Sequence, residues 1–258
     1  MPKIGNFFMT QSTPHYKRAI LKISGESFST PGILGIDPDE LNTIARQIVD
    51  AAKLGTELAV VVGGGNIIRG AELASRVGIP KATADYMGML GTVINALALK
   101  EAIEQQGHPA RVMSALDIES VAEPFIRARA LRHFDKGRVL ILAAGTGNPF
   151  FTTDTCASLR AIELGADILL KATKVDGVYS ADPLKDTDAK LFRSITFTEA
   201  INKQLGVMDM TALSMCMEHD LPVVVFNFKE DGNICKVVGG DAIGTIVCNK
   251  TESVLANA

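Results

Sequence analysis

Hydrogen-bond donors and glycines crowd into one short stretch, residues 144–154 (AGTGNPFFTTD), directly after the apolar run 139–143. Glycine lets the backbone approach a ligand closely, because no Cβ stands in the way. The residues that follow have helical spacing, and the N-terminus of a helix attracts anions. The neutral side-chain donors are those of Thr146, Asn148, Thr152 and Thr153. This combination favours a site for an anionic ligand, and the alternative is an ordinary strand-to-helix loop whose threonines cap the helix.

Two other segments could act on phosphate. Lys22 lies at the end of the apolar run 19–23, just before Ser24 and Gly25, and three glycines, 63–65, follow the apolar run 58–62. Successive backbone amides can bind phosphate oxygens, and a lysine charge can stabilise a phosphoryl group in transfer. The alternatives are that Lys22 is a solvated residue at a strand end and that the glycines form only a tight turn.

Several familiar sets of catalytic residues are absent from the sequence. It contains no Walker A motif and neither the HRD nor the DFG set of protein kinases. The histidines lie outside the motifs, at His15, His108, His133 and His219. No histidine base is therefore indicated. A phosphate acceptor would need none, because its second pKa is about 6 and it is largely a dianion at neutral pH. A carboxylate acceptor would fit equally well.

Apolar runs of strand length alternate with segments of helical spacing along the chain. Strands are predicted at 19–23, 58–62, about 110–113, 139–143, 167–170 and 223–226, and helices at 38–54, 85–106, 125–134, 155–164 and 208–219. This alternation predicts an α/β fold: a single three-layer αβα domain with a mainly parallel central sheet. The motifs stand where strands end, the side of such a sheet on which ligands bind. The polar stretch 173–190 is predicted to be a long functional loop.

The clearest helix start is Asp37-Pro38-Asp39-Glu40. It offers an N-cap residue, a proline at the first helical position and a carboxylate at the third. An apolar stripe at helical spacing follows it, and Gly55 ends the helix.

Composition limits the class of protein. The 258 residues carry a formal net charge of −3, and the pI is about 5.8, so no nucleic-acid partner is indicated. No apolar run approaches the roughly 20 residues that span a bilayer, so no membrane partner is indicated either. The cysteines Cys156, Cys216, Cys235 and Cys248 lack metal-ligand spacing and lie in apolar segments. We expect buried thiols in a reducing, cytoplasmic environment.

The two ends of the chain have a different character. Residues 1–15 lack the features of a secretion signal and are expected to form a disordered tail, with Met9 as an alternative start. Residues 251–258 are expected to be a frayed C-terminal tail. The domain is expected to occupy 16–250.

The stretch TGNPFFTTD resembles the nucleoside-monophosphate loop of bacterial uridylate kinases, which are members of the amino acid kinase family. Three more segments match in the expected order: KISGE at 22–26, GGGNIIRG at 63–70, and KATKVDGVY at 171–179, with ADP at 181–183 just after. Four ordered matches span the chain from its first strand almost to its last. The resemblance implies an amino acid kinase-like fold.

The resemblance also implies roles for individual residues. The implied ATP-binding residues are Lys22, Ile23, Ser24, Gly25, Gly65, Arg69, Thr173, Tyr179 and Asp182. The implied UMP-binding residues are Gly64, Asp85, Thr146, Gly147, Asn148, Pro149, Phe150, Phe151, Thr152 and Thr153. The implied catalytic residues are Lys22, Asp154 and Asp209, the two acids orienting phosphates or magnesium. No residue is identified as a metal ligand. Asp154 and Asp85 could instead be helix caps, and Asp209 a helix start.

The implied activity is phosphoryl transfer from Mg-ATP to UMP, giving UDP and ADP in pyrimidine nucleotide biosynthesis, with Mg²⁺ as cofactor. The family also implies a homohexamer, inhibition by UTP and activation by GTP. The segment at the position of the GTP-activation loop comprises Thr30, Pro31, Gly32, Ile33, Leu34 and Gly35. Its residues differ from the family's, which leaves GTP regulation open.

Two rival functions stand beside this one. A kinase of the same family could make an acyl phosphate on a carboxylate or carbamate, although the TGNPFFTTD loop matches the uridylate branch. A non-catalytic nucleotide- or oxyanion-binding protein could share the fold, as molybdenum storage proteins do. The presence of Lys22, Asp85 and Asp154 favours catalysis.

Overall fold

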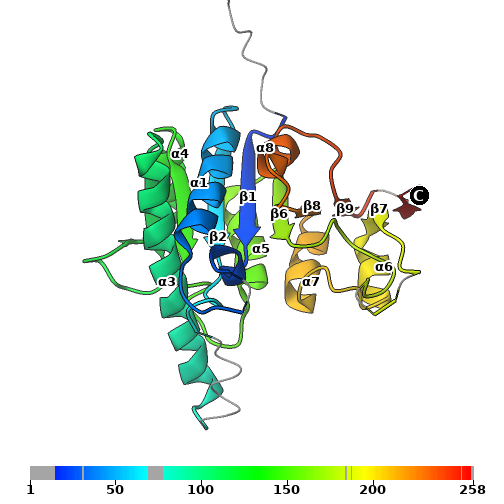
Figure 1. The fold of residues 1–258 in the computed structure, drawn as a ribbon, viewed down its shortest axis with the longest axis horizontal. Coiled ribbons are helices and arrows are strands. Elements are labelled where there is room, and N and C mark those ends of the chain that lie inside the picture. Colours follow the sequence, from blue (N-terminus) through cyan, green and yellow to red (C-terminus); the bar gives the residue numbers. More distant parts are fainter. Residues whose placement is uncertain are drawn as a thin grey trace, which may run out of the picture.

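A sheet of ten strands, in the order β10-β7-β9-β8-β6-β1-β2-β5-β3-β4, forms the centre of the described part of the chain (Figure 1). The computed structural model describes residues 15–30, 32–68, 78–183, 185–186, 188–250 and 252–256. The strands are β1 (Arg18–Ile23), β2 (Glu57–Val62), β3 (Ala110–Ser114), β4 (Glu123–Pro124), β5 (Val139–Ala143), β6 (Ile168–Thr173), β7 (Phe192–Thr196), β8 (Val223–Asn227), β9 (Thr245–Cys248) and β10 (Val254–Leu255). The helices are the 3-10 helix η1 (Gly25–Phe28), α1 (Pro38–Ala52), α3 (Lys81–Gln105), α4 (Arg127–Phe134), α5 (Thr153–Leu164), α6 (Phe197–Asn202), α7 (Met210–Glu218) and α8 (Asn233–Val238).

Neighbouring strands run parallel except in the pairs β8–β9 and β10–β7. The predicted mainly parallel α/β sheet is therefore confirmed. Its central strands read as unbroken apolar runs because helices cover both of their faces. Parallel strands end at a common edge, so the segments that follow β1, β2, β5 and β6 are brought together.

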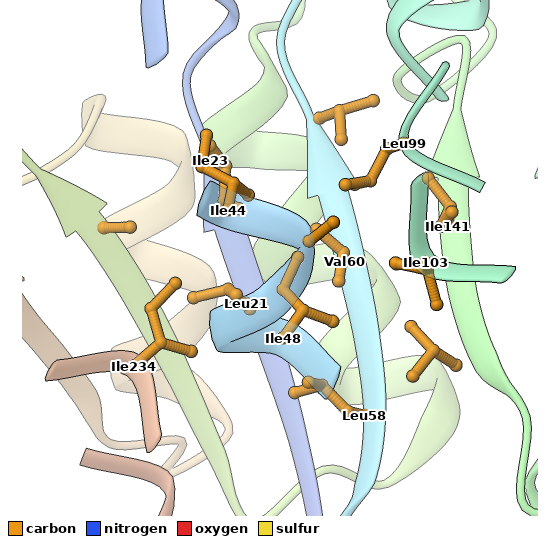
Figure 2. Packing of buried hydrophobic residues seen from close by; sticks show 14 of the residues in the cluster. Leu21, Ile23, Ile44, Ile48, Leu58, Val60, Leu99, Ile103, Ile141 and Ile234 are labelled. Carbon is orange, nitrogen blue, oxygen red and sulfur yellow. The ribbon is translucent and has the colours of Figure 1, made fainter. Parts of the chain in front are cut away.

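The two faces of the sheet bury separate apolar clusters, because side chains alternate along each strand. On one face, Leu21 of β1 and Val60 of β2 belong to the same buried cluster as Ile48 of α1 and Ile103 of α3 (Figure 2). Ile20, the neighbour of Leu21 on β1, points to the other face of the sheet and lies in a cluster with residues of α5 and α7. Helices packed on both faces of the sheet therefore hold the strand ends, and the residues that follow them, in place.

The helix start at Asp37 is confirmed. Its carboxylate accepts hydrogen bonds from the backbone N–H groups of Asp39 (2.9 Å) and Glu40 (3.3 Å), and Pro38 is the first helical residue. Ile44 and Ile48, four residues apart, are fully buried, as the apolar stripe predicts.

Two helices begin earlier than predicted, which excludes two capping alternatives. α3 begins at Lys81 and has Pro80 at its N-cap position, so Asp85 lies one turn inside the helix and does not cap it. α5 begins at Thr153 with Thr152 as its N-cap, so Asp154 does not cap this helix.

The C-terminal end also differs from the prediction. A frayed end is expected over 251–258, but Val254–Leu255 forms β10 and pairs with β7. The strands β7 and β9 and the helices α6 and α8 were not predicted; each is four to six residues long. Residues 1–14, including Met9, lie outside the described residues.

Two further expectations can be compared with the described residues. All four cysteines are free thiols; Cys156 and Cys216 are buried as expected, whereas Cys235 and Cys248 are only half-buried. Among the described segments, no helix combines the length and the apolar character that crossing a bilayer would require.

Candidate active site

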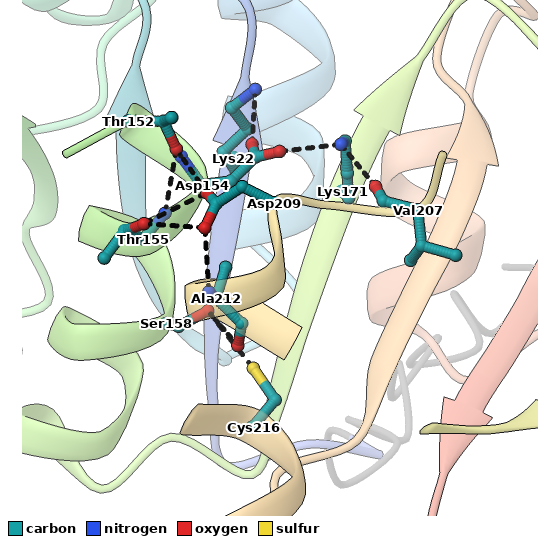
Figure 3. Close-up of polar contacts among 10 residues, drawn as sticks. All are labelled: Lys22, Thr152, Asp154, Thr155, Ser158, Lys171, Val207, Asp209, Ala212 and Cys216. Atoms are coloured by element: carbon teal, nitrogen blue, oxygen red, sulfur yellow. Dashed lines mark hydrogen bonds and ion pairs between the residues drawn. The ribbon is translucent and has the colours of Figure 1, made fainter. Parts of the chain in front are cut away.

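Two lysines on neighbouring strands contact one carboxylate. Lys22 of β1 and Lys171 of β6 are direct partners in the parallel register. The Nζ atom of Lys22 lies 2.7 Å from Oδ1 of Asp154, and that of Lys171 lies 2.8 Å from Oδ2 (Figure 3). The three side chains are only 10%, 14% and 13% exposed, in the order Lys22, Lys171, Asp154. Lys171 also donates to the carbonyl of Val207.

The charges in this cluster are strongly coupled. Burial raises the pKa of Asp154, but the positive charges of Lys22 and Lys171 outweigh burial and hold that pKa below its ordinary value. Burial lowers the pKa of Lys171, and the charge of Asp154 opposes this shift. Two ammonium groups contact one carboxylate near the ends of β1 and β6, and the charge of Asp209 also acts on Lys171. Ammonium groups of this kind can form charge-assisted hydrogen bonds with phosphate oxygens.

Asp209 is fully engaged by the protein. It is the N-cap of α7, as its helix-start alternative anticipates, and accepts from the backbone N–H of Ala212 at 3.0 Å. The hydroxyl of Thr155 lies 3.0 Å from each of its oxygens, and the Thr152 hydroxyl donates to it as well (Figure 3). Asp209 therefore ties α7 to the start of α5, the helix that carries Asp154.

A cavity of about 260 Å³ lies against the predicted UMP loop. It is lined by most of the predicted UMP-binding residues, namely Gly64, Asp85, Thr146, Asn148, Phe150, Phe151, Thr152 and Thr153. We call it the acceptor cavity. Gly65, predicted on the ATP side, lines it too. Gly147 and Pro149 belong to the same loop but do not line the cavity; a Cβ on Gly147 would stand 2.9 Å from the carbonyl oxygen of Ala115.

Asp85 reaches from α3 to the predicted UMP loop. One of its oxygens accepts from the backbone N–H of Phe150 at 2.8 Å, and Lys81 lies 3.0 Å from the carboxylate. Phe150 has a positive φ of 72°, which is rare for a residue with a side chain. The residue is 68% exposed. The contact with Asp85 holds this unusual turn at the mouth of the acceptor cavity.

A second cavity, of about 480 Å³, contains the predicted adenine and ribose side of the ATP site. Thr173, Tyr179 and Asp182 all line it, together with the segment 203–206. We call it the donor cavity. Burial raises the pKa of Tyr179, and the nearby Asp176 carboxylate adds to this effect. Thr173, Val175 and residues 177–183 of the polar stretch 173–190 thus line this cavity.

The glycines after β1 and β2 allow two backbones to touch. A Cβ on Gly25 would stand 2.4 Å from the amide nitrogen of Gly65, and one on Gly63 would stand 2.5 Å from that of Gly25. Gly63 donates its N–H to the carbonyl of Ile23, so that amide is committed to the protein. The prediction that all three glycine amides face a ligand is therefore wrong for Gly63, whereas Gly64 and Gly65 line the acceptor cavity.

Two further residues predicted on the ATP side, Ile23 and Ser24, directly precede Gly25. The Ile23 side chain is fully buried, so only its backbone can serve a ligand. The hydroxyl of Ser24 lies 3.2 Å from that of Ser27. Arg69 lies outside the described residues.

The predicted regulatory segment is linked to the glycine segment through Asn66. The N–H of Gly35 donates to the Asn66 carbonyl, and the Asn66 amide donates to the Gly35 carbonyl, both at 2.8 Å. Ile33 and Leu34 are 62% and 66% exposed. Thr30 donates to the carboxylate of Asp37, Gly32 has a φ of 82°, and Pro31 lies outside the described residues.

The acidic residues do not form a cage for a metal ion. No group of three or more histidine, cysteine or acidic side chains that could hold a metal occurs among the described residues. Both oxygens of Asp154 contact lysines, and both oxygens of Asp209 accept from protein donors. Mg²⁺ is commonly held by substrate phosphates and water with only one or two carboxylates. Such a metal would not require a cluster of acidic ligands in the protein.

Lys171 is not among the predicted site residues. The sequence indicates local phosphate chemistry for the basic pair Lys171 and Lys174, but nothing in the KATKVDGVY segment distinguishes one lysine from the other. The distinguishing signal is shared by two strands: Lys22 lies near the end of the predicted strand 19–23, Lys171 directly follows the predicted strand 167–170, and the two lysines are register partners in the sheet.

With this geometry in place, comparison with known proteins identifies the family. A model of the Amino acid kinase family matches residues 17–227. The chain belongs to the amino acid kinase family. A curated relative, the uridylate kinase of Methylococcus capsulatus, is 53% identical over 234 residues, which cover 91% of this chain and 98% of that protein.

Solved structures agree with the family assignment. A UMP kinase from Bacillus anthracis shares 37% identity with a TM-score of 0.91 and covers 94% of this chain and 99% of that one. A UMP kinase from Ureaplasma parvum shares 36% identity with a TM-score of 0.85, covering 90% and 99%. The αβα fold and its amino acid kinase topology are thereby confirmed.

Proposed function

We propose that the protein transfers the γ-phosphoryl group of Mg-ATP to UMP, giving UDP and ADP in pyrimidine nucleotide biosynthesis. The observation that carries the proposal is that members of the Lys22–Asp154–Lys171 cluster adjoin, along the chain, residues that line both cavities. Asp154 directly follows Thr152 and Thr153 of the acceptor cavity. Lys171 precedes Thr173 of the donor cavity by two residues and donates to Val207, which follows the wall segment 203–206. The names of the relatives, uridylate kinase and UMP kinase, support the choice of acceptor.

The residues of this chain would act by position and charge. A phosphate oxygen of UMP attacks the γ-phosphorus of ATP while the bond to the leaving ADP oxygen breaks. The ammonium groups of Lys22 and Lys171 stabilise the charge that spreads over the transferring group. Asp154 contacts both lysines and would hold their ammonium groups in position for this role. The acceptor phosphate is already deprotonated near neutral pH, so no side chain has to remove a proton.

We also propose that the protein is cytoplasmic, assembles as a homohexamer and is regulated by GTP and UTP. Its free cysteines suit a reducing compartment. Tyr86, Leu90 and Ile94, four residues apart on α3, are 43%, 48% and 47% exposed and form an apolar stripe that suits association. The contacts between Gly35 and Asn66 would connect an effector at residues 30–35 to the glycine segment.

A coupled assay of ADP release tests the function. UMP should give a far higher kcat/KM than CMP, AMP or a panel of carboxylates. Comparable kcat/KM for AMP or a carboxylate would refute UMP as the preferred acceptor. Tight nucleotide binding without any ADP release would instead support the non-catalytic alternative.

A further inference from the structure

Thr92, on α3, holds the start of the acceptor loop. Its hydroxyl accepts a hydrogen bond from the backbone N–H of Ala144 at 2.7 Å and donates to the carbonyl of Met89 at 2.6 Å. Thr92 is 3% exposed, and Ala144 is completely buried. Ala144 follows β5 directly and has a φ of 62°, a conformation that side chains rarely adopt. The chain therefore turns away from the sheet at the residue that Thr92 holds.

Thr245, on β9, makes the same pair of bonds at the other nucleotide loop. Its hydroxyl accepts from the backbone N–H of Val178 at 2.9 Å and donates to the carbonyl of Phe192. Thr245 is completely buried. A Cβ on Gly177 would stand 2.4 Å from its Oγ1, so the loop backbone is pressed against this hydroxyl. Val178 and Tyr179, which follow, line the donor cavity.

A hydroxyl suits this task because it carries one donor and two acceptor lone pairs. A single threonine can satisfy a buried amide and a buried carbonyl at once, and a buried amide left without a partner is strongly disfavoured. Each hydroxyl thus selects one position for its loop. Among the described residues none lines both cavities, and the two threonines hold different loops, so the effect of each hydroxyl can be tested separately.

We propose that Thr92 and Thr245 are positioning residues, one for each nucleotide: Thr92 sets the affinity for the acceptor and Thr245 the affinity for the donor. The assignment of the two ligands rests on the proposed function. The proposal that the two threonines hold the loops does not rest on the proposed function, because this role belongs to the protein without bound nucleotide.

The kinetic test compares Thr92→Val with Thr245→Val, each of which keeps the shape of the side chain and removes the hydroxyl. Thr92→Val should raise the KM for UMP on the order of tenfold and leave the KM for ATP unchanged, because a small misplacement of a binding group has large effects. Thr245→Val should do the reverse. Thr92→Ser and Thr245→Ser keep the hydroxyl and should restore wild-type KM values. Equal effects of either valine variant on both KM values would overturn the proposal.

Thr92 also lines the acceptor cavity, so loss of a direct contact with UMP must be distinguished from displacement of the loop. Amide hydrogen exchange of the nucleotide-free protein makes this distinction. Thr92→Val should accelerate exchange at Ala144 and Gly145 but not at Val178, and Thr245→Val should accelerate it at Val178 only. Unchanged exchange at both loops would overturn the proposal even if the KM values changed. If the wild type fails to phosphorylate UMP, the exchange result still decides whether the threonines hold the loops.

Should either valine variant fail to fold, the alanine variants leave room for a water molecule to accept from the amide. Thr92→Ala should then raise mainly the KM for UMP, and Thr245→Ala mainly the KM for ATP, each by less than the corresponding valine variant. Uniform effects on both nucleotides would count against the proposal.

Discussion

The ammonium group of Lys22 is held in place by the carboxylate of Asp154. Its contribution to catalysis should come mainly from stabilising the transition state. Replacing it in Lys22→Ala leaves Asp154 paired with Lys171, so the protein should stay folded. We expect kcat to fall about 100-fold or more, as when one electrostatic stabiliser is removed. UMP affinity, measured by calorimetry, should change little, because the charge matters most when the phosphoryl group is in transfer. A folded variant with nearly unchanged kcat would make Lys22 an ordinary strand-end residue.

Asp85 should act on the acceptor alone. Its carboxylate lines the acceptor cavity and would accept from the ribose hydroxyls of UMP. Asp85→Asn should raise the KM for UMP about tenfold, since a hydrogen bond to a charged group contributes about 1.5–3 kcal/mol, and should leave the KM for ATP nearly unchanged. The wild type should discriminate against 2′-deoxy-UMP, and the variant less so. Unchanged discrimination would reduce Asp85 to its contacts with Phe150 and Lys81.

The types of residue at strand ends predicted much of the candidate site. The other site residues became recognisable only from the pairing of strands that lie far apart in the sequence. Lys22 was predicted because a lysine near the end of an apolar run, close to Gly25, can direct its charge at a transferring phosphoryl group. Lys171 was not, because its importance depends on being the register partner of Lys22 across 149 positions of sequence. Only the sheet topology defines that partnership. The hydroxyls of Thr92 and Thr245 were missed for a similar reason, since their partners are backbone groups 52 and 67 residues away.

The helix α5 presents a buried carboxylate to two strands, and this connection should respond to pH. The pKa of Asp154 is lower in the folded protein, so its stabilising contribution is complete above the unfolded value of about 4 and is lost as the pH falls through the folded value. Asp154→Asn leaves two buried ammonium groups without their counter-charge and should cost about 3 kcal/mol or more at neutral pH.

Urea unfolding across a pH series measures this effect. The gap in unfolding free energy between wild type and Asp154→Asn should begin to narrow below pH of about 4, and it should narrow further as the pH falls through the lowered pKa of Asp154 in the folded protein, where this side chain becomes neutral. It should narrow again at alkaline pH, because Lys171 has a lowered pKa and loses its charge there first. A gap that stays constant from acid to alkaline pH would contradict this coupling.

Helices and strands were predicted from the sequence where a capping residue or a long apolar pattern marks them. α1 has an N-cap, a proline and an apolar stripe, and it begins at the predicted residue. α3 was predicted to begin at Asp85 because aspartate is a good cap, but its N-cap position is held by Pro80, which offers no capping side chain. β7 (FRSIT) contains Arg193, Ser194 and Thr196 and so lacks the continuous apolar run by which the central strands were predicted, and β10 is only two residues long.

The whole molecule should associate through α3 if the proposed hexamer forms. The stripe of Tyr86, Leu90 and Ile94 is half-exposed in the single chain, and an exposed apolar row on a helix is typical of an interface. Leu90→Lys combined with Ile94→Lys should shift the assembly to smaller species in analytical ultracentrifugation. Lys100→Glu, on the same helix beyond the stripe, serves as a charge-changing control. An assembly of unchanged size would exclude this stripe as the interface.

The separateness of the two cavities has a consequence for the order of events. No described residue lines both cavities, so in the proposed reaction neither nucleotide would have to leave before the other enters, and both would be present when the phosphoryl group moves. Initial-rate plots for the two substrates should therefore intersect, whereas a ping-pong reaction would give parallel lines. A single molecule with adenosine and uridine joined by a chain of phosphates should bind far more tightly than either nucleotide, because its second end enters at a high effective concentration. Affinity no better than that of ATP would mean that the two cavities cannot be filled at once.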